Sequence, residues 1–186
     1  MPRFGLPNID IVFKQKAVTA VQRSERGILC ILVQDDKQTE GVTRFTYRRG
    51  SDVDKTSFSD TNYTAIMRAF DVAVNKVYVF RYASTVEEKA VYKEVEKVRF
   101  NYICTNVTEK QQPLANYVRQ FNVDSKGHKI VCVVANVATA DSKYIINVKG
   151  TGGTLKDKDT AVKVEDYLIR IASTLCNLPM NRSLTY

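Results

Sequence analysis

Two adjacent carboxylates at the end of an apolar run are the first residues in this chain whose types suggest chemistry. Asp35 and Asp36 directly follow residues 28–33, ILCILV. Such a pair after a buried strand can bind Mg²⁺ in receiver-type domains, where a further Asp on the third strand and a Lys on the fifth complete the site. The third expected strand ends instead in Thr105 and Asn106. The pattern therefore predicts a solvated turn at Asp35 and Asp36, and no metal site.

Residues 150–154, GTGGT, are a second candidate because a glycine-rich loop can bind phosphate. A phosphate-binding loop needs a Lys and a Ser or Thr after its last glycine, and a helix that begins at once. Here Thr154 and Leu155 lead into the charged residues KDKD, and the expected helix begins several residues later. We predict a loop or hairpin turn at this stretch, and no nucleotide site.

Nucleophilic catalysis would need a histidine beside a serine or cysteine. The single histidine, His128, precedes an expected strand, whereas ligands of parallel α/β sheets bind at the carboxyl ends of the strands. Cys30, Cys104 and Cys132 lie in apolar runs, Cys176 lies near the end of a helical run, and none forms a C-x-x-C pair. The sequence therefore predicts buried, reduced thiols and no metal centre.

The other polar residues at expected strand ends form no set that matches a known kind of site. They are Arg81, Ser84, Thr105, Asn106, Asn136 and Thr151–Thr154. We therefore predict that the chain is not an enzyme and has no catalytic, cofactor-binding or metal-binding residues. One alternative stays open: a small cytoplasmic α/β enzyme or nucleotide-binding domain that uses Asp35, Asp36 and residues 150–154.

The elements that would position these residues follow from apolar spacing. Residues 129–137, KIVCVVANV, contain six consecutive apolar residues rich in β-branched types, which is typical of a strand buried on both faces in the middle of a parallel sheet. Further strands are expected at 28–33, 42–47 (half-exposed, at an edge), 76–82, 100–104 and 144–148. Helical spacing predicts helices over 63–74, 86–97, 114–121 and 161–175. This alternation predicts an α/β fold whose mostly parallel sheet has helices on both faces.

Two helix starts carry recognisable capping residues. Asp60 or Thr61 can cap the first helix. Thr108 and Gln111 have the spacing of a capping box ahead of the third helix.

Length and charge bound the possible partners. The chain has 186 residues and a formal charge of +8, with basic residues spread along it and acidic residues between them. Because a nucleic-acid binder tends to gather Lys and Arg on one face, we predict no nucleic-acid partner. No apolar run approaches the ~18 residues of a membrane span, and the N-terminus lacks a signal-peptide core. We therefore expect no membrane insertion and a cytoplasmic place of synthesis.

Residues 1–22 differ from the rest of the chain and predict an extended arm. Pro2, Gly5 and Pro7 exclude a helix at its start. Beyond them, Ile9, Ile11 and Phe13 alternate with Asp10, Val12 and Lys14, the period of a strand. We expect residues 23–186 to form the α/β domain. Because residues 182–186 look like a strand without a continuation, we also expect that domain to be cut short at its C-terminal end.

The order of these segments resembles that of contractile phage tail sheath proteins, of the short type found in defective prophages and phage-like particles, over their N-terminal portion. The similarity spans nearly the whole chain in order. It rests on residues 5–36, 76–82 (KVYVFRY), 99–106 (RFNYICTN), 129–148 and 160–186.

The resemblance implies a structural subunit that polymerises as a helical sleeve around a tail tube and contracts to drive the tube through a cell envelope. It implies neighbouring sheath subunits and the tail tube protein as partners. The protein would sit in the tail sheath of a virion or phage-like particle assembled in the bacterial host cytoplasm. In this family, extended arms pair with strands of neighbouring subunits.

The residues of the arm support such pairing. Ordering about eight residues costs roughly 8–16 kcal/mol of backbone entropy. Ladder hydrogen bonds return about 2–9 kcal/mol, and burying Ile9, Ile11 and Phe13 returns about 5–9 kcal/mol more. The sum is near zero, so the arm should order only where a partner offers both a strand edge and an apolar face. The alternative is an arm that folds back on the edge of its own domain.

Overall fold

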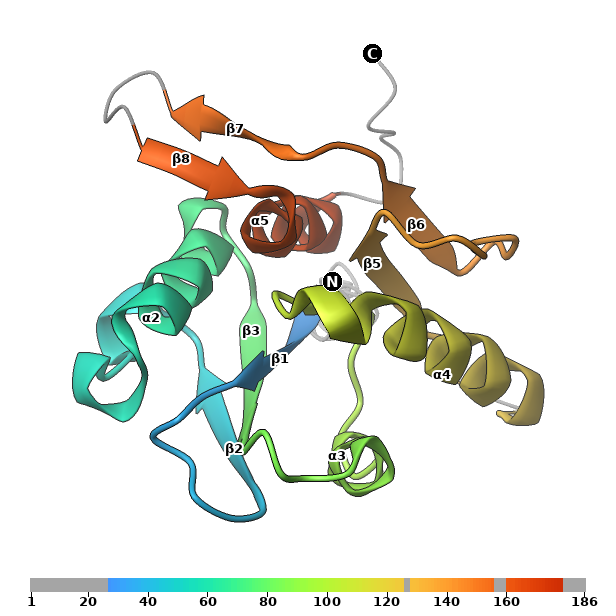
Figure 1. Ribbon diagram of the computed structural model, residues 1–186, viewed down its shortest axis with the longest axis horizontal. Helices are drawn as coiled ribbons and strands as arrows, with labels where there is room; N and C mark the ends of the chain where they lie inside the picture. Colours follow the sequence, from blue (N-terminus) through green and yellow to red (C-terminus); the bar gives the residue numbers. More distant parts are fainter. Residues whose placement is uncertain (1–26, 126–127, 156–159, 179–186) are drawn as a thin grey trace, which may run out of the picture.

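A six-stranded sheet forms the centre of the protein (Figure 1). The computed structural model describes residues 27–125, 128–155 and 160–178. The strands lie in the order β2-β3-β1-β4-β5-β6, and every neighbouring pair is parallel except β2 and β3. Their bounds are β1 (Ile28–Gln34), β2 (Val42–Tyr47), β3 (Lys76–Tyr82), β4 (Tyr102–Thr105), β5 (Val131–Ala135) and β6 (Ile145–Val148). The predicted α/β class with a mostly parallel sheet is confirmed.

The strand at the centre of the sheet is β1, between β3 and β4. Leu29, Ile31 and Val33 have no exposed surface, and Cys30 and Leu32 on the other face are exposed by at most 4%. The prediction that residues 129–137 lie in the middle was wrong in position, because β5 is second from the edge and β6 lies outside it. A two-sided apolar pattern reports burial on both faces, and a strand next to an edge has that burial too.

Among the described residues, four α-helices cover the sheet, and all four lie close to their expected places. They are α2 (Asp60–Met67), α3 (Glu88–Val95), α4 (Gln111–Asp124) and α5 (Val164–Asn177). Short 3₁₀ helices lie in the connections next to α2 and α4: η1 (Gly50–Asp52), η2 (Lys55–Ser57) and η3 (Arg68–Asp71) flank α2, and η4 (Thr108–Lys110) precedes α4. The first helix is shorter than predicted, since α2 ends at Met67 and tightens into η3.

Both expected helix caps were wrong. The side chain of Ser59, one residue earlier than predicted, caps α2 by accepting from the Asn62 N–H at 3.4 Å. The Thr108–Gln111 capping box does not form, because the Gln111 amide donates instead to the carbonyls of Thr105 and Val107. Buried strand-end carbonyls need a donor more than an exposed helix start does.

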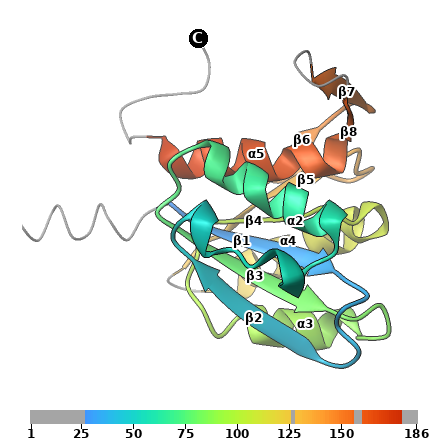
Figure 2. The same cartoon turned by 90° about the vertical axis from the view of Figure 1, so that its left-hand side faces the viewer.

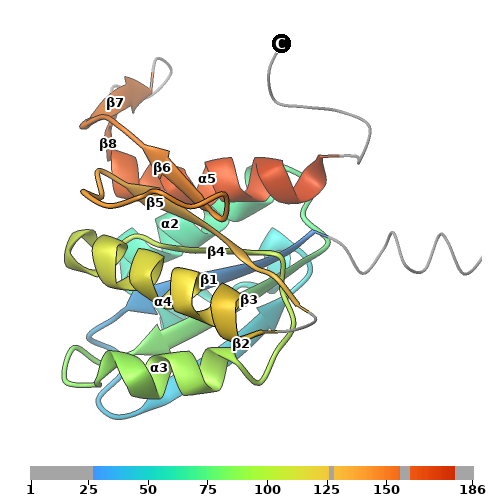
Figure 3. The same cartoon turned by 90° about the vertical axis from the view of Figure 1, so that its right-hand side faces the viewer.

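The two faces of the sheet carry separate apolar layers. Alternate residues of β1 face opposite ways, and Figures 2 and 3 show α5 on the opposite side of the sheet from α3. On one face, α2 and α5 pack on the sheet through Ile66, Leu168, Ile169 and Ala172. On the other, α3 and α4 pack through Val91, Val95, Leu114, Ala115 and Val118.

A small antiparallel hairpin extends past the sheet near the start of α5 (Figures 2 and 3). Its strands are β7 (Gly152–Leu155) and β8 (Thr160–Lys163). Residues 152–154, predicted as part of a loop or turn, therefore lie in a strand, and residues 161–163, predicted as helix, lie in its partner. Gly152 has φ +119°, and a Cβ there would lie 2.2 Å from the Val162 carbonyl oxygen, so this position requires glycine.

All four cysteines are free thiols, and three of them are buried, with Cys176 half-buried. The expectation of reduced cysteines is consistent with this arrangement. Within the described part of the chain, no helix is long and apolar enough to cross a membrane. The arm over residues 1–22, with Ile9, Ile11 and Phe13, and the expected strand at 182–186 lie outside the described residues.

Candidate functional site

The carboxyl ends of β1 and β4 carry a cluster of buried polar side chains, which makes this edge of the sheet the first place to look for a site. Its first member is Asp35, which has only 2% of its surface exposed. The prediction of a solvated turn was wrong for Asp35, whereas its neighbour Asp36 is exposed as expected. Asp35 turns inward because three donors, from the turn after β1 and from the start of α2, converge on its carboxylate.

Those donors use both carboxylate oxygens of Asp35. Oδ1 accepts from the Lys37 N–H at 3.0 Å, and Oδ2 accepts from the Ser59 N–H at 2.8 Å and from the Asn62 side-chain amide at 2.7 Å. Burial alone would raise the pKa of Asp35, but these hydrogen bonds hold it below its usual value. Asp35 is thus a charged acceptor that fastens the start of α2 to the end of β1.

Asn62 extends the cluster from β1 toward β4. Its amide also donates to the Gln34 carbonyl at 2.7 Å, and its side-chain oxygen accepts from the Asn106 amide at 2.8 Å. Helix α2 is therefore tied to the ends of two strands by one buried side chain. Sequence reasoning missed Asn62, although a polar residue four positions before Ile66, and so on the apolar side of the helix, could have indicated it.

Gln111 ties helix α4 to the ends of β4 and β5 in a similar way. Its amide donates to the Thr105 carbonyl at 2.9 Å, and its side-chain oxygen accepts from the Ala135 N–H at 3.1 Å. The Thr105 hydroxyl in turn donates to the Leu32 carbonyl at 2.9 Å. Thr105, a strand-end candidate in the sequence, thus joins β4 to β1. The sequence predicted Gln111 as part of a capping box, so its role between β4 and β5 was missed.

Helix α5 brings two acidic residues to the border of this cluster. Asp166 lies 4.0 Å from Arg68 of η3, with both side chains largely buried. Burial raises the pKa of Asp166, while Arg68 opposes that rise. Glu165, with 9% exposed, accepts a hydrogen bond from the Thr108 hydroxyl at 3.3 Å. These contacts join α5 to the loops beneath it.

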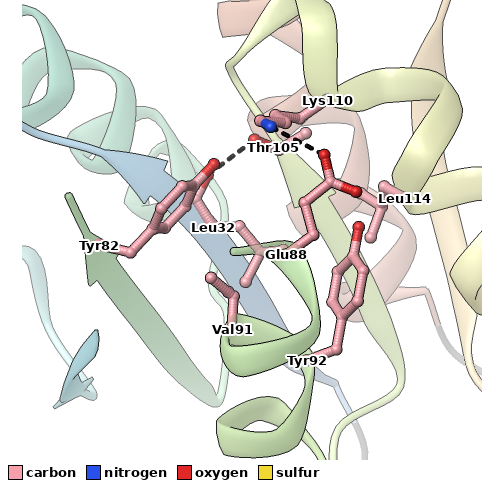
Figure 4. Close-up of a pocket in the computed structure, with 8 residues that line it drawn as sticks. All are labelled: Leu32, Tyr82, Glu88, Val91, Tyr92, Thr105, Lys110 and Leu114. Atoms are coloured by element: carbon pink, nitrogen blue, oxygen red, sulfur yellow. Dashed lines mark hydrogen bonds and ion pairs between the residues drawn. The ribbon is translucent and has the colours of Figure 1, made fainter. Parts of the chain in front are cut away.

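A small cavity lies on the other face of the sheet, between β1, β3, β4, α3 and α4 (Figure 4). Its volume is about 10 Å³, which is room for one water molecule and far below the ~300 Å³ of a small ligand site. Lys110 and Glu88 form an ion pair of 2.8 Å at its border, and the Tyr82 hydroxyl bonds to Thr105. Burial, with a contribution from Glu88, raises the pKa of Tyr82 to about 12.

The remaining strand-end candidates are engaged in local structure. Arg81 lies over the rings of Phe45 and Phe58, with its guanidinium carbon 5.1 and 5.7 Å from their centres. Asn136 exchanges two hydrogen bonds with the backbone of Gly150, at 2.6 and 3.1 Å. Ser84 lies on the surface.

The structure does not bring together the residues of the alternative enzyme hypothesis. Asp35 follows β1, whereas residues 150–154 follow β6, and β4 and β5 lie between those strands. His128 lies at the opposite, amino end of the sheet, with its ring edge-on to Phe100 and Phe121. No group of three potential metal ligands occurs among the described residues. The polar side chains described at this edge therefore hold loops and helices in place.

The two outer strands of the sheet are the other surfaces that could serve a function. β2 and β6 each have one neighbour among the strands that the structure describes. Arg44 and Thr46 of β2 are exposed to solvent, whereas Ile146 and Val148 of β6 are half-buried and pack against the apolar layer that contains α2 and α5. An exposed strand edge can accept a strand from another chain, and charged residues oppose such pairing.

Comparison with known proteins agrees with the resemblance seen in the sequence. No family model matches the chain. A protein named tail sheath protein, from the Clostridium phage phiCD119, is 27% identical over 193 aligned positions, covering 98% of this chain. The match covers 51% of that relative, so the chain spans about half the length of the curated relative it matches.

Two solved structures share the fold. A sheath tail protein from Desulfitobacterium hafniense has a TM-score of 0.68 and 16% identity, with 87% of this chain and 61% of the other covered. A sheath tail protein from Listeria innocua has a TM-score of 0.67 and 14% identity, with 92% and 61% covered. The predicted resemblance is confirmed: this chain is similar to a phage tail sheath protein along nearly all of its length, and its α/β fold is that of bacterial sheath tail proteins.

Proposed function

We propose that the chain forms part of a tail sheath subunit, a structural protein that associates with copies of itself. The observation that carries this proposal is the similarity to a tail sheath protein over 98% of the chain. The polar cluster at the strand ends supports it, because its members bond to backbone and to one another. The domain then serves as a rigid unit, and no chemistry is assigned to it.

The finer proposal is that the subunits form a helical sleeve around a tail tube and contract to drive the tube through a cell envelope. During such a change, each domain must move as one body. Buried ties such as Asp35–Asn62–Asn106 and Gln111–Ala135 support this role, since each joins elements that are far apart in the sequence. Packed interiors shift between discrete arrangements and resist continuous deformation.

The arm is proposed as the link between subunits. Ile9, Ile11 and Phe13 would lie on one face of a strand that adds to a sheet edge of a neighbouring subunit. Main-chain hydrogen bonds would give this contact its affinity, while the three apolar side chains would set its register. The tail tube protein is the second partner that this proposal implies.

The test is electron microscopy of the intact subunit carrying Ile11→Asp. We expect the variant to fold, with an unchanged circular dichroism spectrum, but to form no sheath-like tubes by negative stain, because a carboxylate would be buried at the subunit contact. Val12→Asp, on the opposite face of the same strand, is the matched control and should still form tubes. Normal tubes from Ile11→Asp would rule out the arm as the link, while tubes missing from every protein, including the unmodified one, would count against the sheath function itself.

A further inference from the structure

Charged side chains on one half of the sheet are divided between its two ends. The parallel strands run in one direction (Figure 2), and antiparallel β2 ends beside the start of β3, since Tyr47 pairs with Val77. Four basic residues lie at the end where the parallel strands begin: Arg48 and Arg49 directly after β2, Lys76 at the start of β3, and Arg99 three residues before β4. We call these four residues the basic end.

The basic end keeps its charge available for a partner. Three of its residues are exposed, and the fourth, Lys76, is half-buried with its amine 5.7 Å from the centre of the Tyr78 ring. Within the part of the chain that the structure describes, none of the four forms an ion pair. The exposed acids Asp52 and Glu96 lie toward the same end, but the four cations outnumber them. The surplus of charge at this end is therefore positive.

The opposite end of the same strands carries acidic residues. Asp36 follows β1, Glu40 precedes β2 by two residues, and Glu87 and Glu109 lie in the connections after β3 and β4. We call these four residues the acidic end. All four are exposed, and none of them is ion-paired among the described residues. The amine of Lys37, in the same turn as Asp36, is already bonded to the carbonyls of Thr56 and Phe58.

The two ends match strand by strand. β2 has Glu40 at one end and Arg48 at the other. In the same way, β3 lies between Lys76 and Glu87, and β4 lies between Arg99 and Glu109. A second copy displaced along the strand direction would therefore bring a cation of one copy to an acid of the other at three neighbouring strands.

We propose that the basic end of one copy of this chain docks on the acidic end of the next. Complementary potentials steer two copies into this orientation, whereas two basic ends or two acidic ends repel each other. Such a contact joins different surfaces of the two copies, so it can repeat into an open helical assembly. This inference rests on the proposed self-association of the subunit, and it names the surfaces that take part.

The contact should be weak and sensitive to salt. Each exposed ion pair adds little affinity, and dissolved ions screen it. Sedimentation velocity of the nuclease-treated 186-residue chain measures this directly. We expect association at about 0.01 M salt, where charges act over ~30 Å, and monomers at about 1 M salt, where they act over ~3 Å.

Charge reversal at each end tests which surfaces meet. At low salt, the double variant Arg48→Glu with Arg49→Glu should associate about tenfold more weakly than the unmodified chain, because like charges then face each other. The double variant Asp36→Lys with Glu40→Lys should behave in the same way. An equal mixture of the two variants should associate again, since the two reversed ends complement each other.

A matched control separates the contact from net charge. Lys89→Glu with Lys93→Glu changes the net charge by the same amount as the Arg48 and Arg49 reversal, but on exposed residues of α3, which covers a face of the sheet. This variant should not weaken association. Circular dichroism spectra should be unchanged in all three variants, which shows that each is folded.

Four results would overturn the proposal. The first is a control variant that associates as weakly as the reversal at the basic end, and the second is a mixture that stays monomeric. The third is association that high salt leaves unchanged. The fourth is association seen only before nuclease treatment, which would assign the basic end to nucleic acid.

The failure of this contact differs from a failure of the sheath function. A 186-residue chain that is monomeric at both salt concentrations would rule out docking between the two ends. If the intact subunit still formed tubes by negative stain, the sheath function would stand and its subunits would be joined by other surfaces.

Discussion

Asp35 places a charged carboxylate beneath the carboxyl end of β1, where its oxygens accept hydrogen bonds from Lys37, Ser59 and Asn62. These donors come from the turn after β1, from the N-cap of α2, and from the first turn of α2. One buried side chain therefore fixes two loops and a helix start. A buried charge of this kind is tolerated because both carboxylate oxygens accept hydrogen bonds.

The first prediction concerns the removal of that charge. Asp35→Asn replaces one acceptor oxygen by an NH₂ group that faces N–H donors, so at least one donor loses its partner. We expect a loss of about 1–3 kcal/mol in the free energy of unfolding, measured by urea denaturation. Asp36→Asn is the control and should stay within about 0.5 kcal/mol of the unmodified chain, because Asp36 is exposed. Equal effects from both changes would show that the buried contacts of Asp35 contribute nothing.

The second prediction is the pH dependence of the same contribution. The pKa of Asp35 is lower in the folded chain than its ordinary value, so the folded state binds the proton less well than the unfolded state does. The stability from Asp35 is therefore fully present above the unfolded pKa of ~3.9 and is lost as the pH falls through the lower folded pKa. Urea midpoints of the unmodified chain and of Asp35→Asn should thus differ at neutral pH and converge in acid. A difference that grows on acidification would contradict this assignment.

At the scale of elements, the start of β1 lies against the end of α5. Gly27 has φ +83°, and its N–H, like that of Ile28, donates to the Asn101 side-chain oxygen at 3.0 and 3.1 Å. A Cβ at Gly27 would lie 2.6 Å from the Cys176 carbonyl oxygen. The first strand and the last helix, far apart in the sequence, therefore approach each other where a side chain cannot fit.

The third prediction separates this close approach from simple backbone strain. Gly41 also has a positive φ, +67°, but nothing lies within 4 Å of a Cβ there. Gly41→Ala should cost about 1–3 kcal/mol of stability from the left-handed backbone alone. Gly27→Ala should cost clearly more, because α5 must also shift away from β1, and its urea midpoint should fall below that of Gly41→Ala. If the two midpoints match, the contact with Cys176 is not a constraint.

The elements differ in how well the sequence predicts them. Runs such as ILCILV and KVYVFRY identify β1 and β3 because burial on both faces leaves a pattern in each strand by itself. The order of strands and the place of β5 depend on partners, which no single segment encodes. The roles of Asp35, Asn62 and Gln111 were missed for the same reason: a polar residue reads as exposed until the donors and acceptors from other elements are known. The hairpin β7–β8 was misassigned in part because Gly152 and Gly153 leave no side-chain pattern.

For the molecule as a whole, two apolar layers and the tied strand ends point to one rigid body. The sheet is buried on both faces by α2 with α5 and by α3 with α4. The carboxyl edge, where an α/β enzyme would keep open loops and reactive groups, is closed by amide and hydroxyl contacts to backbone. This arrangement is compatible with the proposed role of the domain as a rigid building block.

The fourth prediction tests that conclusion against the alternative of a nucleotide-binding or enzyme domain. A ligand that binds the folded chain and is present at 100 times its Kd stabilises it by about 2.7 kcal/mol. For a domain of this size, that stabilisation corresponds to a rise in Tm of roughly 5–11 °C. We expect nucleotides, flavins and Mg²⁺, each at millimolar concentration, to leave the Tm unchanged, because the cavity beside Tyr82 has room for only one water molecule and both oxygens of Asp35 already accept hydrogen bonds. A reproducible shift that Asp35→Asn abolishes would show that the strand ends do form a ligand site, and it would replace the structural function by a binding one.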